Sequence, residues 1–262
     1  MPASGPTSVT VISLPGTPER RARFAAGAAD AGLPWTFFDA RTSVTAPLTY
    51  DERRARRTHG RTLTVGEIGN YASHFAVWQR FLASDAAQMI VFEDDVTVDW
   101  TFVRHIASLD FSAMGLSYLR LFTKIPARFR KVRCPFIDRY HHLIRITSYA
   151  LGTQAYLVTR DGAERFVEGA SHVDSPVDTY MDKYWRHGVP NLAVYPFPVF
   201  ERCDPSTIGE ARFEKQAIPV SDRLPLIFRR LRDRVAMVQN ALGRDPGGIE
   251  RAMLRRLDRG SV

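Results

Sequence analysis

The sequence has 262 residues, of which 45% are hydrophobic and 24% charged, a composition that suits one large α/β domain and excludes global disorder. The formal net charge is +8, but residues 223–262 hold ten Arg, no Lys, three Asp and one Glu and so carry +6 of it. The rest of the chain is nearly neutral. This argues against a nucleic-acid-binding protein, since such proteins usually spread positive charge along a binding face.

Neither the N-terminal segment nor the cysteines indicate export. Residues 1–8 are small and polar, and no apolar stretch approaches the ~20 residues that span a bilayer. Cys134 and Cys203 lack a metal-binding spacing, and we interpret them as reduced thiols, with a single disulfide as the alternative. The sequence therefore predicts a cytoplasmic protein.

The first forty residues predict a strand, a helix and a second strand. Residues 9–14 are a β-branched run typical of a buried strand. Thr17 before Pro18 combines a capping residue with a proline at the first helical position, so a helix is expected to begin there and to run to Ala31. A second strand is expected at residues 35–38. This order favours a parallel sheet.

An Arg-rich segment, residues 41–63, is expected to form a loop or an irregular helix, either as a solvated surface or as a mobile flap over an anionic donor. Thr64 and Glu67 then fit a capping box at the start of a helix. Apolar residues follow at helical spacing over residues 68–82. Residues 88–92 predict a third strand, which ends directly in three acidic residues.

The region after these acidic residues predicts further strands and helices around one irregular segment. That segment, residues 123–147, is basic and rich in aromatic residues and His. The predicted elements are strands at residues 116–122, 151–159 and 191–199 and helices at residues 161–167 and 176–187.

The C-terminal residues form a basic amphipathic pattern, in which apolar residues recur in steps of three or four, apart from one adjacent pair, with Arg residues between them. Such a helix either lies in a membrane interface or packs its apolar stripe on the parent domain. We therefore divide the chain into a domain over residues 1–222 and a basic amphipathic helical tail over residues 223–262. The apolar stripe consists of Leu224, Ile227, Phe228, Leu231, Val235, Val238 and Leu242.

The segment MIVFEDDV places Glu93, Asp94 and Asp95 at the end of an apolar strand. Side chains at the carboxyl ends of strands in an open α/β sheet point into the ligand crevice. Three carboxylates crowded there repel one another, and Mg²⁺ or Mn²⁺ relieves this repulsion while bridging to substrate phosphates. The alternative is an acidic turn that caps the next helix. A phosphatase of the haloacid dehalogenase type is excluded, because Glu93 stands where its nucleophilic Asp would be.

Six segments resemble glycosyltransferase family 25, the bacterial lipooligosaccharide transferases related to the collagen galactosyltransferases. Each segment alone is weakly specific, but six in the same order over roughly residues 9–212 are strongly specific. The segments are VISLPGTPERR, LTVGEIGNYASHFAVW, IVFEDDV, GTQAYLVTRDGAERF, SPVDTYM and DPSTIGEAR.

The resemblance implies a GT-A-type fold, in which a Rossmann-like sheet flanked by helices binds a nucleotide sugar. It implies a nucleoside-diphosphate sugar donor, with a UDP-sugar favoured, and inversion at the sugar carbon. It also implies Mn²⁺ or Mg²⁺ held by Glu93 and Asp95, with Asp94 against the donor. Asn70 stands where the family often has Cys, which we interpret as a packing change. Residues 122–147 match no family element, so the acceptor is not readable.

Four residues around the first strand and helix are expected near the donor phosphates. They are Ser13, Thr17, Arg20 and Arg21, and they are singled out because a helix start and Arg side chains both suit phosphate. One of the two Arg residues can instead be an ordinary surface charge.

Five more residues are donor-binding candidates on two other elements. Glu67, Ser73 and His74 share the capping-box helix, although Glu67 can serve only as a cap and His74 can be a satisfied polar residue at the core edge. Gly152 and Thr153 begin a strand and would let the backbone approach the sugar, with a simple turn as the alternative.

An inverting transferase needs a general base for the acceptor hydroxyl. Asp178 and Asp182 are four residues apart on one helical face, and both are candidates. Asp178 is the first choice because it belongs to the Pro-Val-Asp segment of the resemblance. Its alternative role is that of a first-turn acid favoured by the helix dipole.

The sequence-based hypothesis is a metal-assisted enzyme that moves a hexose, such as galactose, onto a hydroxyl of a lipooligosaccharide or other cell-surface glycan. The tail would hold it at the cytoplasmic face of the inner membrane, as a peripheral contact. The alternative from another class is a catalytically silent, membrane-associated scaffold with the same fold. No nucleic-acid partner is expected.

Overall fold

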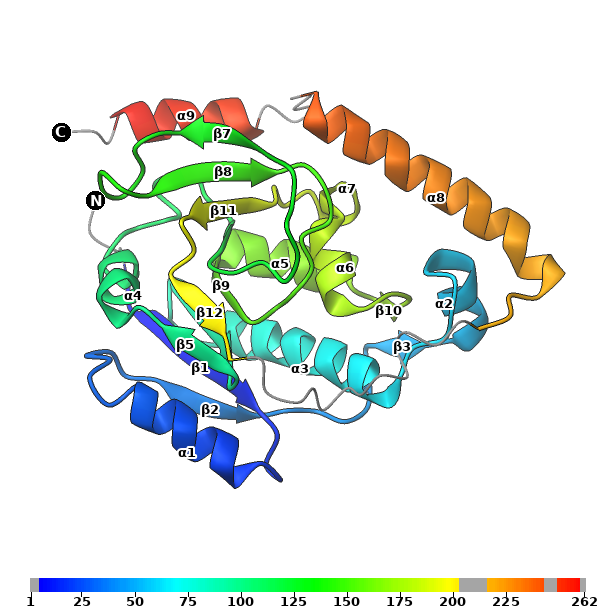
Figure 1. Ribbon diagram of the computed structural model, residues 1–262, viewed down its shortest axis with the longest axis horizontal. Coiled ribbons are helices and arrows are strands. Elements are labelled where there is room, and N and C mark those ends of the chain that lie inside the picture. Colours follow the sequence, from blue (N-terminus) through cyan, green and yellow to red (C-terminus); the bar gives the residue numbers. More distant parts are fainter. Residues whose placement is uncertain (1–4, 203–215, 243–248, 260–262) are drawn as a thin grey trace.

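The computed structural model describes residues 5–202, 216–242 and 249–259. Within these residues, eight strands form one mixed sheet in the order β2-β1-β4-β9-β6-β11-β8-β7 (Figure 1). β1 runs parallel to both β2 and β4, whereas β9 is antiparallel to its neighbours β4 and β6. The strands are β1 (Thr7–Ser13), β2 (Thr36–Asp39), β4 (Gln88–Glu93), β6 (Tyr118–Arg120), β7 (Phe129–Arg133), β8 (His142–Ile146), β9 (Ala155–Thr159) and β11 (Leu192–Tyr195).

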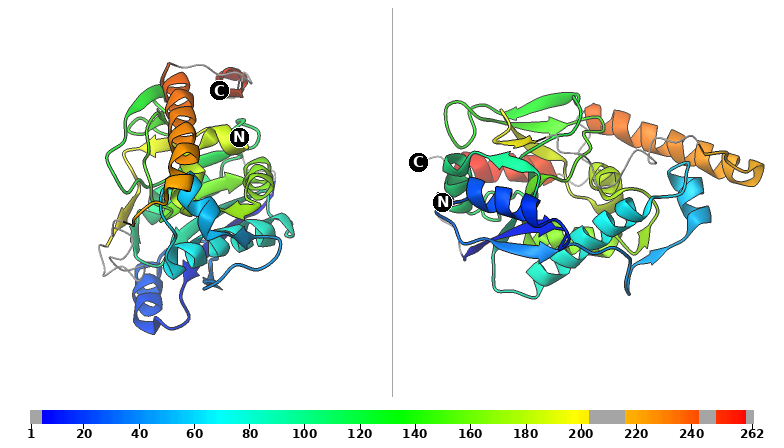
Figure 2. Two further views of the ribbon diagram at one scale, coloured as in Figure 1. Left: turned by 90° about the vertical axis from the view of Figure 1, so that its right-hand side faces the viewer. Right: turned by 60° about the horizontal axis from the view of Figure 1, so that its bottom comes forward.

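Helices cover both faces of this sheet (Figure 2). Alternate residues of β1 and β4 point to opposite faces, so Val11 and Phe92 belong to one buried cluster and Ile12 and Val91 to the other. The first cluster includes residues of α1 (Pro18–Gly27), α4 (Trp100–Ala107) and α9 (Ile249–Arg259). The second includes residues of α3 (Val65–Leu82), α5 (Arg160–Gly169) and α6 (Val177–Asp182).

The remaining elements lie around the edges of the sheet. They include two small two-stranded sheets, β3 with β10 and β5 with β12. Their bounds, with those of the other helices, are β3 (Thr49–Tyr50), β5 (Val96–Val98), β10 (His172–Val173), β12 (Val199–Glu201), α2 (Glu52–Thr58), α7 (Tyr184–His187) and α8 (Val220–Ala241).

The predicted α/β class, with a large sheet flanked by helices and a C-terminal helix, is confirmed. The capping box is confirmed as well: the Thr64 hydroxyl accepts from the Glu67 N–H, and Glu67 accepts from the Thr64 N–H. Other details differ from the prediction. α1 ends at Gly27, and the Thr17 side chain does not cap it but donates to the Leu14 carbonyl.

Three further predicted elements differ from the structure. The strand expected at residues 191–199 is divided into β11 and β12, because Pro196 and Pro198 between them cannot donate ladder hydrogen bonds. The helix expected at residues 176–187 is divided at Lys183, where ψ is 66°. The segment expected to be irregular contains β7 and β8 at the sheet edge.

The long helix α8 packs on the body, next to α2, through its polar face (Figure 1). Asp222 accepts from Arg57 Nε at 2.8 Å and Arg56 Nε at 3.3 Å, and Asn240 accepts from Arg145 Nε at 2.7 Å. All seven residues of the apolar stripe are exposed, by 50% to 70%. Of the two alternatives for this stripe, packing on the parent domain is therefore not what the described residues show.

Some sequence-based expectations fall outside the described residues. Residues 204–212, which carry the DPSTIGEAR segment, and Cys203 are among them, whereas Cys134 is described and exposed. The boundary at residue 222 stays a prediction.

Within the described ranges, no helix combines the length and the apolar character that crossing a membrane requires.

Candidate active site

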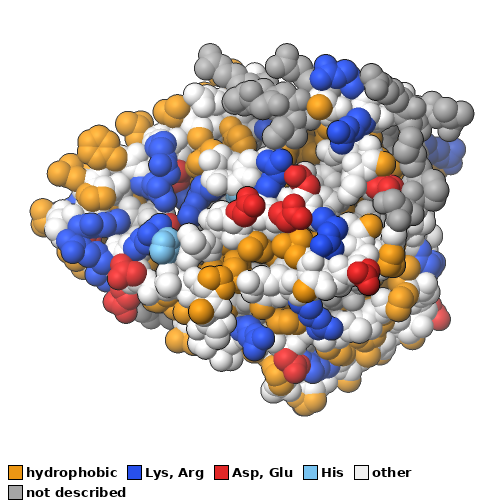
Figure 3. Space-filling view, turned by 180° about the vertical axis from the view of Figure 1, so that it is seen from behind, with side chains coloured by type: hydrophobic (Ala, Val, Ile, Leu, Met, Phe, Trp, Pro, Cys, Tyr) orange, Lys and Arg blue, Asp and Glu red, His pale blue; other side chains and the backbone are white. Residues whose placement is uncertain are grey.

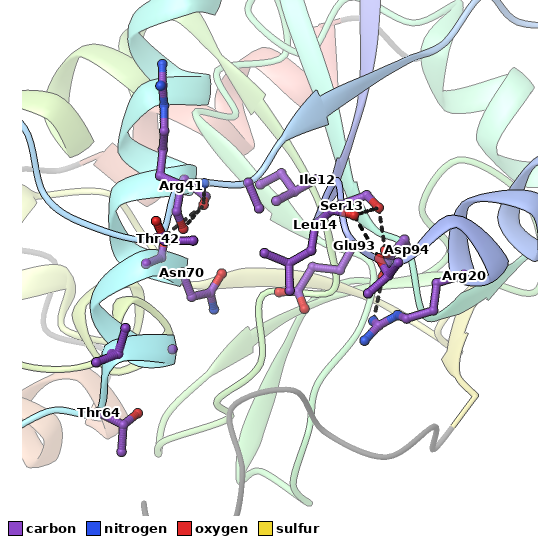
Figure 4. A pocket seen from close by; sticks show the side chains of 16 residues that line it. Ile12, Ser13, Leu14, Arg20, Arg41, Thr42, Thr64, Asn70, Glu93 and Asp94 are labelled. Carbon is purple, nitrogen blue, oxygen red and sulfur yellow. Dashed lines mark hydrogen bonds and ion pairs between the residues drawn. The ribbon is translucent and has the colours of Figure 1, made fainter.

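A cavity of about 420 Å³, here called the strand-end cavity, opens where β1 and β4 end side by side (Figure 4). These parallel strands end at the same edge, which brings Ser13 close to Glu93 and Asp94. The start of α3 forms another wall, with Thr64 and Val65. Around this edge, Figure 3 shows acidic side chains gathered near the middle of one face, with Lys and Arg side chains beside them. Further lining residues are Thr17, Arg20, Arg41, Asn70 and Ser73.

Arg20 binds the acidic cluster directly. Its guanidinium forms an ion pair with Asp94 Oδ1 and a second one, of 2.9 Å, with Asp95 Oδ2. The Ser13 hydroxyl donates to the other Asp94 oxygen at 2.6 Å. Asp94 thus has a partner for each oxygen, and it connects Ser13 with Arg20 in the wall of the cavity. The prediction that Ser13, Arg20 and Asp94 lie together agrees with this geometry.

Arg21 also has a fixed position and is not a solvated surface charge. Its Nε donates to the Ser13 hydroxyl and its Nη2 to the Ser13 carbonyl, both at 3.0 Å. The same guanidinium forms an ion pair with Asp39 at the end of β2. Arg21 therefore holds the end of β1 in place, while Arg20 beside it faces the cavity.

Glu93 lies at the floor of the site with its side chain 19% exposed. It accepts from the Thr153 hydroxyl, and that hydroxyl in turn accepts from Asn70 Nδ2 at 3.4 Å. Burial alone would raise the pKa of Glu93. The neighbouring His74 and the Thr153 hydrogen bond outweigh burial, so the net pKa of Glu93 is lowered. Glu93 is thus ionised at neutral pH.

His74 is fully buried and faces Glu93, with 3.6 Å between Nε2 and Oε1. Its Nδ1 lies 2.9 Å from the hydroxyl of Tyr156, which accepts from Trp78 Nε1. Burial raises the pKa of Tyr156, so this hydroxyl keeps its proton and can donate it to Nδ1. The ring proton then sits on Nε2, toward Glu93. His74 is thus a polar residue of the interior beside Glu93, and its contact with a donor stays a prediction.

Glu93 and Asp95 fit a divalent cation. Asp95 Oδ1 is buried and has no hydrogen-bond partner among the described residues. Burial and the charge of Glu93 raise the pKa of Asp95 to about 7. An unpartnered carboxylate oxygen beside a second carboxylate suits a cation that prefers oxygen ligands. The described residues contain no group of three His, Cys, Asp or Glu that could hold a metal alone, so donor phosphates and water would have to complete the coordination.

Asp182 is a structural residue of the interior. Its Oδ1 accepts from Arg120 and Asn191, and its Oδ2 accepts from the N–H groups of Ala150 and Leu151, all within 2.7–2.9 Å. Its side chain is 0% exposed. No lone pair is left for an acceptor proton, so the structure gives no support to the catalytic role expected for Asp182.

Asp178 is only half-buried and lies beside Gly152, whose N–H donates to Oδ2 at 3.2 Å. Burial and the charge of Asp182 raise the pKa of Asp178, which makes it a stronger base. Gly152 has φ of +78°, and a Cβ there would lie 2.5 Å from Gln154 Oε1. The positive φ therefore favours glycine at the turn that links Asp178 to Thr153 and Glu93.

Two other expected residues of α3 act within the protein. Glu67 forms an ion pair with Arg61, with 2.6 Å between Oε1 and Nη2, in addition to its capping role. The Ser73 hydroxyl donates to the Gly69 carbonyl at 2.7 Å and accepts from the Arg41 N–H at 2.8 Å. Ser73 thus pins the segment around Arg41 against α3, and its own contact with a donor stays a prediction.

Sequence reasoning missed three residues of this region. Arg41 and Asn70 line the strand-end cavity, although the first was assigned to a flexible segment and the second to packing. Arg120 is 1% exposed and anchors the turn at Gly152 by donating to its carbonyl at 2.7 Å. A charged residue in the middle of an otherwise apolar strand was the available signal for Arg120, since a buried charge needs partners.

The chain matches known proteins over this same region. A family model for glycosyltransferase family 25, described as LPS biosynthesis protein, matches residues 7–181. A glycosyltransferase 25 family member of Aedes aegypti is 26% identical over 188 residues, which cover 68% of this chain and 30% of that protein. A probable inactive glycosyltransferase 25 family member 3 of Rattus norvegicus is 28% identical over 188 residues, with 66% and 32% covered.

Procollagen galactosyltransferase 2 of Mus musculus is 28% identical over 147 residues, which cover 52% of this chain and 22% of that protein. The chain thus spans about a third or less of the length of these curated relatives. Among solved structures, a glycosyltransferase involved in the glycosylation of the major capsid of PBCV-1 matches with a TM-score of 0.31 and 10% identity, covering 68% of this chain and 66% of that one. That likeness is too low to support a shared architecture.

Proposed function

Because the chain belongs to glycosyltransferase family 25, we propose that it moves a hexose from a nucleoside-diphosphate sugar, with a UDP-sugar favoured, onto a hydroxyl of a lipooligosaccharide or other cell-surface glycan. The observation that carries the proposal is that one turn connects the acidic cluster at Glu93 with the candidate base Asp178. The turn Gly152–Thr153 bonds to Glu93 on one side and to Asp178 on the other. A donor site and a candidate base are thereby held in one rigid arrangement.

The strand-end cavity is the proposed donor site. Its volume of about 420 Å³ lies within the usual range for small-ligand pockets. Arg20 and Arg41 on its walls can neutralise phosphate, and the N-terminus of α3 adds N–H groups and a favourable dipole. Glu93 and Asp95 would hold Mn²⁺ or Mg²⁺, which supplies Lewis-acid neutralisation of the departing diphosphate.

Asp178 is the proposed general base. It takes the proton of the acceptor hydroxyl while that oxygen bonds to the sugar carbon, the bond from this carbon to the phosphate oxygen breaks, and the nucleoside diphosphate leaves with the electron pair. Attack from the face opposite the leaving group inverts the configuration. The raised pKa of Asp178 supports this role, because a more basic carboxylate takes up a proton more readily near neutral pH.

The apolar stripe of α8 supports a peripheral membrane contact as part of this function. An exposed apolar face with Arg residues beside it partitions into an interface that contains anionic lipid. We place the enzyme in the cytoplasm, at the cytoplasmic face of the inner membrane, where a glycolipid acceptor is within its reach.

The competing function is that of a catalytically silent scaffold. It is kept because several relatives, including proteins of rat and mouse, are named inactive. The acidic cluster with an unpartnered Asp95 oxygen favours the active enzyme, since an inactive descendant has no need to keep buried, mutually repelling carboxylates.

Donor hydrolysis by the purified protein separates these two functions. UDP-, GDP-, CMP- and dTDP-sugars are incubated with Mn²⁺ or with EDTA, beside the variants Asp95→Asn and Glu168→Gln. The second is a matched control, because Glu168 is an exposed acid on α5. Nucleotide release from one donor that is lost with EDTA and in Asp95→Asn, but kept in Glu168→Gln, supports the enzyme. Neither turnover nor metal-dependent nucleotide binding with any donor supports the scaffold.

A further inference from the structure

A second cavity, of about 660 Å³ and here called the α8 cavity, lies between α2, α6 and α8. It is distinct from the strand-end cavity, since the two share no lining residue. Its walls combine apolar side chains with several basic ones. The basic side chains on them are Arg128, Lys183, Arg230 and Arg234, and Asp233 is the one acid among the described lining residues.

The charges in this cavity are not balanced. Asp233 is already engaged, because it accepts from Lys183 Nζ at 2.8 Å and from Trp185 Nε1 at 3.0 Å. Arg128, Arg230 and Arg234 have no acidic partner within ion-pair distance in the part of the chain that the structure describes. Three arginines thus line one cavity without an acidic partner among the described residues, and such an arrangement attracts an anion.

Other arginines close by behave differently. On α2, Arg56 and Arg57 both bind Asp222 of α8, and Arg186 of α7 binds Asp174 at 2.7 Å. These arginines are paired where they serve packing, whereas Arg128, Arg230 and Arg234 around the α8 cavity have no acidic partner among the described residues. Burial and the nearby positive charges of Arg61, Lys183 and Arg230 lower the pKa of His59, another lining residue, to about 4, so this imidazole is neutral and the arginines carry the positive charge of the cavity.

The α8 cavity adjoins the proposed base. Its lining residues Leu151 and Thr179 are the direct chain neighbours of Gly152 and Asp178, which are hydrogen-bonded to each other. Leu151 has φ of +52°, a left-handed conformation that is uncommon for leucine and that Asp182 stabilises through its bond to the Leu151 N–H. A ligand in the α8 cavity would therefore lie against the turn that carries the acceptor side of the active site.

The same cavity adjoins the apolar stripe. Arg230, Arg234 and Met237 of α8 form one wall, and stripe residues such as Leu231 and Val235 are their chain neighbours. In Figure 3, apolar side chains gather at the left edge, where α8 lies, with Lys and Arg side chains between them and the acidic side chains. A molecule with an anionic head and an apolar tail matches this arrangement, with its head at the arginines of the α8 cavity and its tail along the apolar stripe.

We propose that the α8 cavity is a phosphate-binding acceptor subsite, in which Arg128, Arg230 and Arg234 hold a phosphate group of an amphiphilic glycan acceptor while its reacting hydroxyl lies beside Asp178. The proposal rests on the transferase function and names the chemical class of its acceptor, a phosphorylated glycolipid. Arginine suits this role because its planar fork of donors matches phosphate oxygens.

Binding of inorganic pyrophosphate, measured by calorimetry, tests the subsite without requiring the acceptor. The test variant is Arg230→Gln/Arg234→Gln. The matched control is Arg223→Gln/Arg232→Gln, which removes the same charge from exposed positions of the same helix. A third variant, Arg20→Gln, weakens binding on the donor side. We expect the test variant to bind pyrophosphate about tenfold or more weakly, because it loses two charged donors to phosphate. Both other variants should retain a site of wild-type affinity.

Three outcomes would overturn the subsite. Equal losses in the test and control variants would mean that only the overall charge of α8 matters. Loss in Arg20→Gln alone would place all pyrophosphate binding in the strand-end cavity. No pyrophosphate binding, together with a selective loss of binding of the test variant to phosphatidylglycerol vesicles, would make the cavity a lipid-headgroup site. Folding of each variant is checked by near-UV circular dichroism, and Arg128→Gln, on a loop outside α8, replaces the double variant if that one does not fold.

A second measurement ties the subsite to the reaction. Hexose phosphates and the matching free hexoses are added as surrogate acceptors to the wild-type protein with its donor. Greater nucleotide release with the phosphates than with the free sugars supports an acceptor subsite, and equal release contradicts it. Absence of both donor turnover and metal-dependent nucleotide binding, with pyrophosphate binding intact, would overturn the proposed transferase and leave an anion site in the α8 cavity.

Discussion

Arg120 and Asp182 form an ion pair in the interior of the protein, with 2.8 Å between Nη2 and Oδ1 and with side chains that are 1% and 0% exposed. The pair fixes the turn at Leu151 and Gly152 from both sides. Arg120 donates to the two carbonyls of this turn, and Asp182 accepts the Leu151 N–H. The turn carries the contacts to Glu93 and Asp178, so the geometry of the site depends on a pair that does not face the substrate.

Asp182→Ala is expected to destabilise the protein by about 3–5 kcal/mol, because it leaves Arg120 as an uncompensated buried charge and two N–H groups without acceptors. Urea unfolding followed by circular dichroism measures the effect. Asp161→Ala, which removes an exposed acid paired with Arg165, serves as the control and is expected to change stability by less than about 1 kcal/mol. A loss below 1 kcal/mol for Asp182→Ala would contradict the structural role.

Asp178→Asn is expected to lower the transfer rate by about 10²–10⁴, the usual contribution of a general base. Its stability should be unchanged or slightly higher, since burial and Asp182 disfavour the charged form of Asp178. Initial rates of transfer and urea unfolding are measured on the same preparation. A loss of stability in Asp182→Ala and a loss of transfer rate in Asp178→Asn would separate the roles of the two aspartates. A full transfer rate in Asp178→Asn would exclude Asp178 as the base.

The buried residue His187 is expected to lower the free energy of unfolding as the pH falls. Burial lowers its pKa to about 3, and in the neutral form Nε2 donates to the Tyr180 carbonyl while Nδ1 accepts from the Val189 N–H. Below the ordinary pKa of ~6.5 the unfolded chain takes up a proton that the folded chain does not, so stability is lost as the pH falls from about 6.5 toward 3.

The size of this effect is about 1.4 kcal/mol per pH unit within that window. His187→Gln should lower the slope of unfolding free energy against pH by this amount, while the contributions of other shifted groups such as His59 and Asp95 remain. The variant can be less stable at neutral pH. His105→Gln, at an exposed position of α4, serves as the comparison and should keep the slope. Parallel curves for the wild-type protein and His187→Gln would show that His187 is not the group responsible.

The apolar stripe of α8 is expected to contribute to membrane binding and not to folding. Ile227→Ser/Leu231→Ser/Val235→Ser changes three side chains that are 58%, 58% and 50% exposed. Since fully burying such a side chain contributes about 1.5–3 kcal/mol, the triple variant should bind phosphatidylglycerol vesicles at least tenfold more weakly. Its unfolding free energy should fall by no more than about 1 kcal/mol.

Leu226→Ser on the same helix offers the contrasting case. Leu226 is 3% exposed, so this variant should lose stability and, where it still folds, should keep its vesicle binding. Vesicle sedimentation and thermal unfolding are measured on both variants. Unchanged sedimentation of the triple variant would exclude the stripe as a membrane contact.

Local signals predicted much of the framework. The capping box at Thr64, the strand that ends at Glu93 and the helical spacing of the stripe depend on residues close in the chain, and each is present in the structure. β7 and β8 were missed for the opposite reason. β7 is a partly exposed, basic edge strand without a clear apolar alternation, and β8 buries Arg145, whose partner Asn240 is 95 residues away.

The site shows the same division. The placement of Ser13, Arg20 and Glu93 at one edge of the sheet was predictable, because strand ends and an acidic triplet are visible in the sequence. The orientation of α8 was not predictable, since helical periodicity identifies an apolar face but not the polar residues that dock it. Asp222 and Asp233 are held by Arg57 and Lys183, residues that a local pattern does not connect to them. The buried, fully hydrogen-bonded position of Asp182 was not predictable, because most of its hydrogen-bond donors are also distant in sequence.

The position of α9 changes how the C-terminal region should be dissected. Met253 and Leu257 are 2% and 8% exposed and belong to the cluster between the sheet and α4, and the Met253 backbone closes over Gly115. A truncation designed to remove α8 would also take these two side chains out of the core, at a cost of about 2–5 kcal/mol for each large side chain lost. Reduced vesicle binding by such a shortened chain could therefore result from a disrupted core as well as from the loss of a lipid-facing helix. Point substitutions on the exposed stripe test membrane binding without removing core residues.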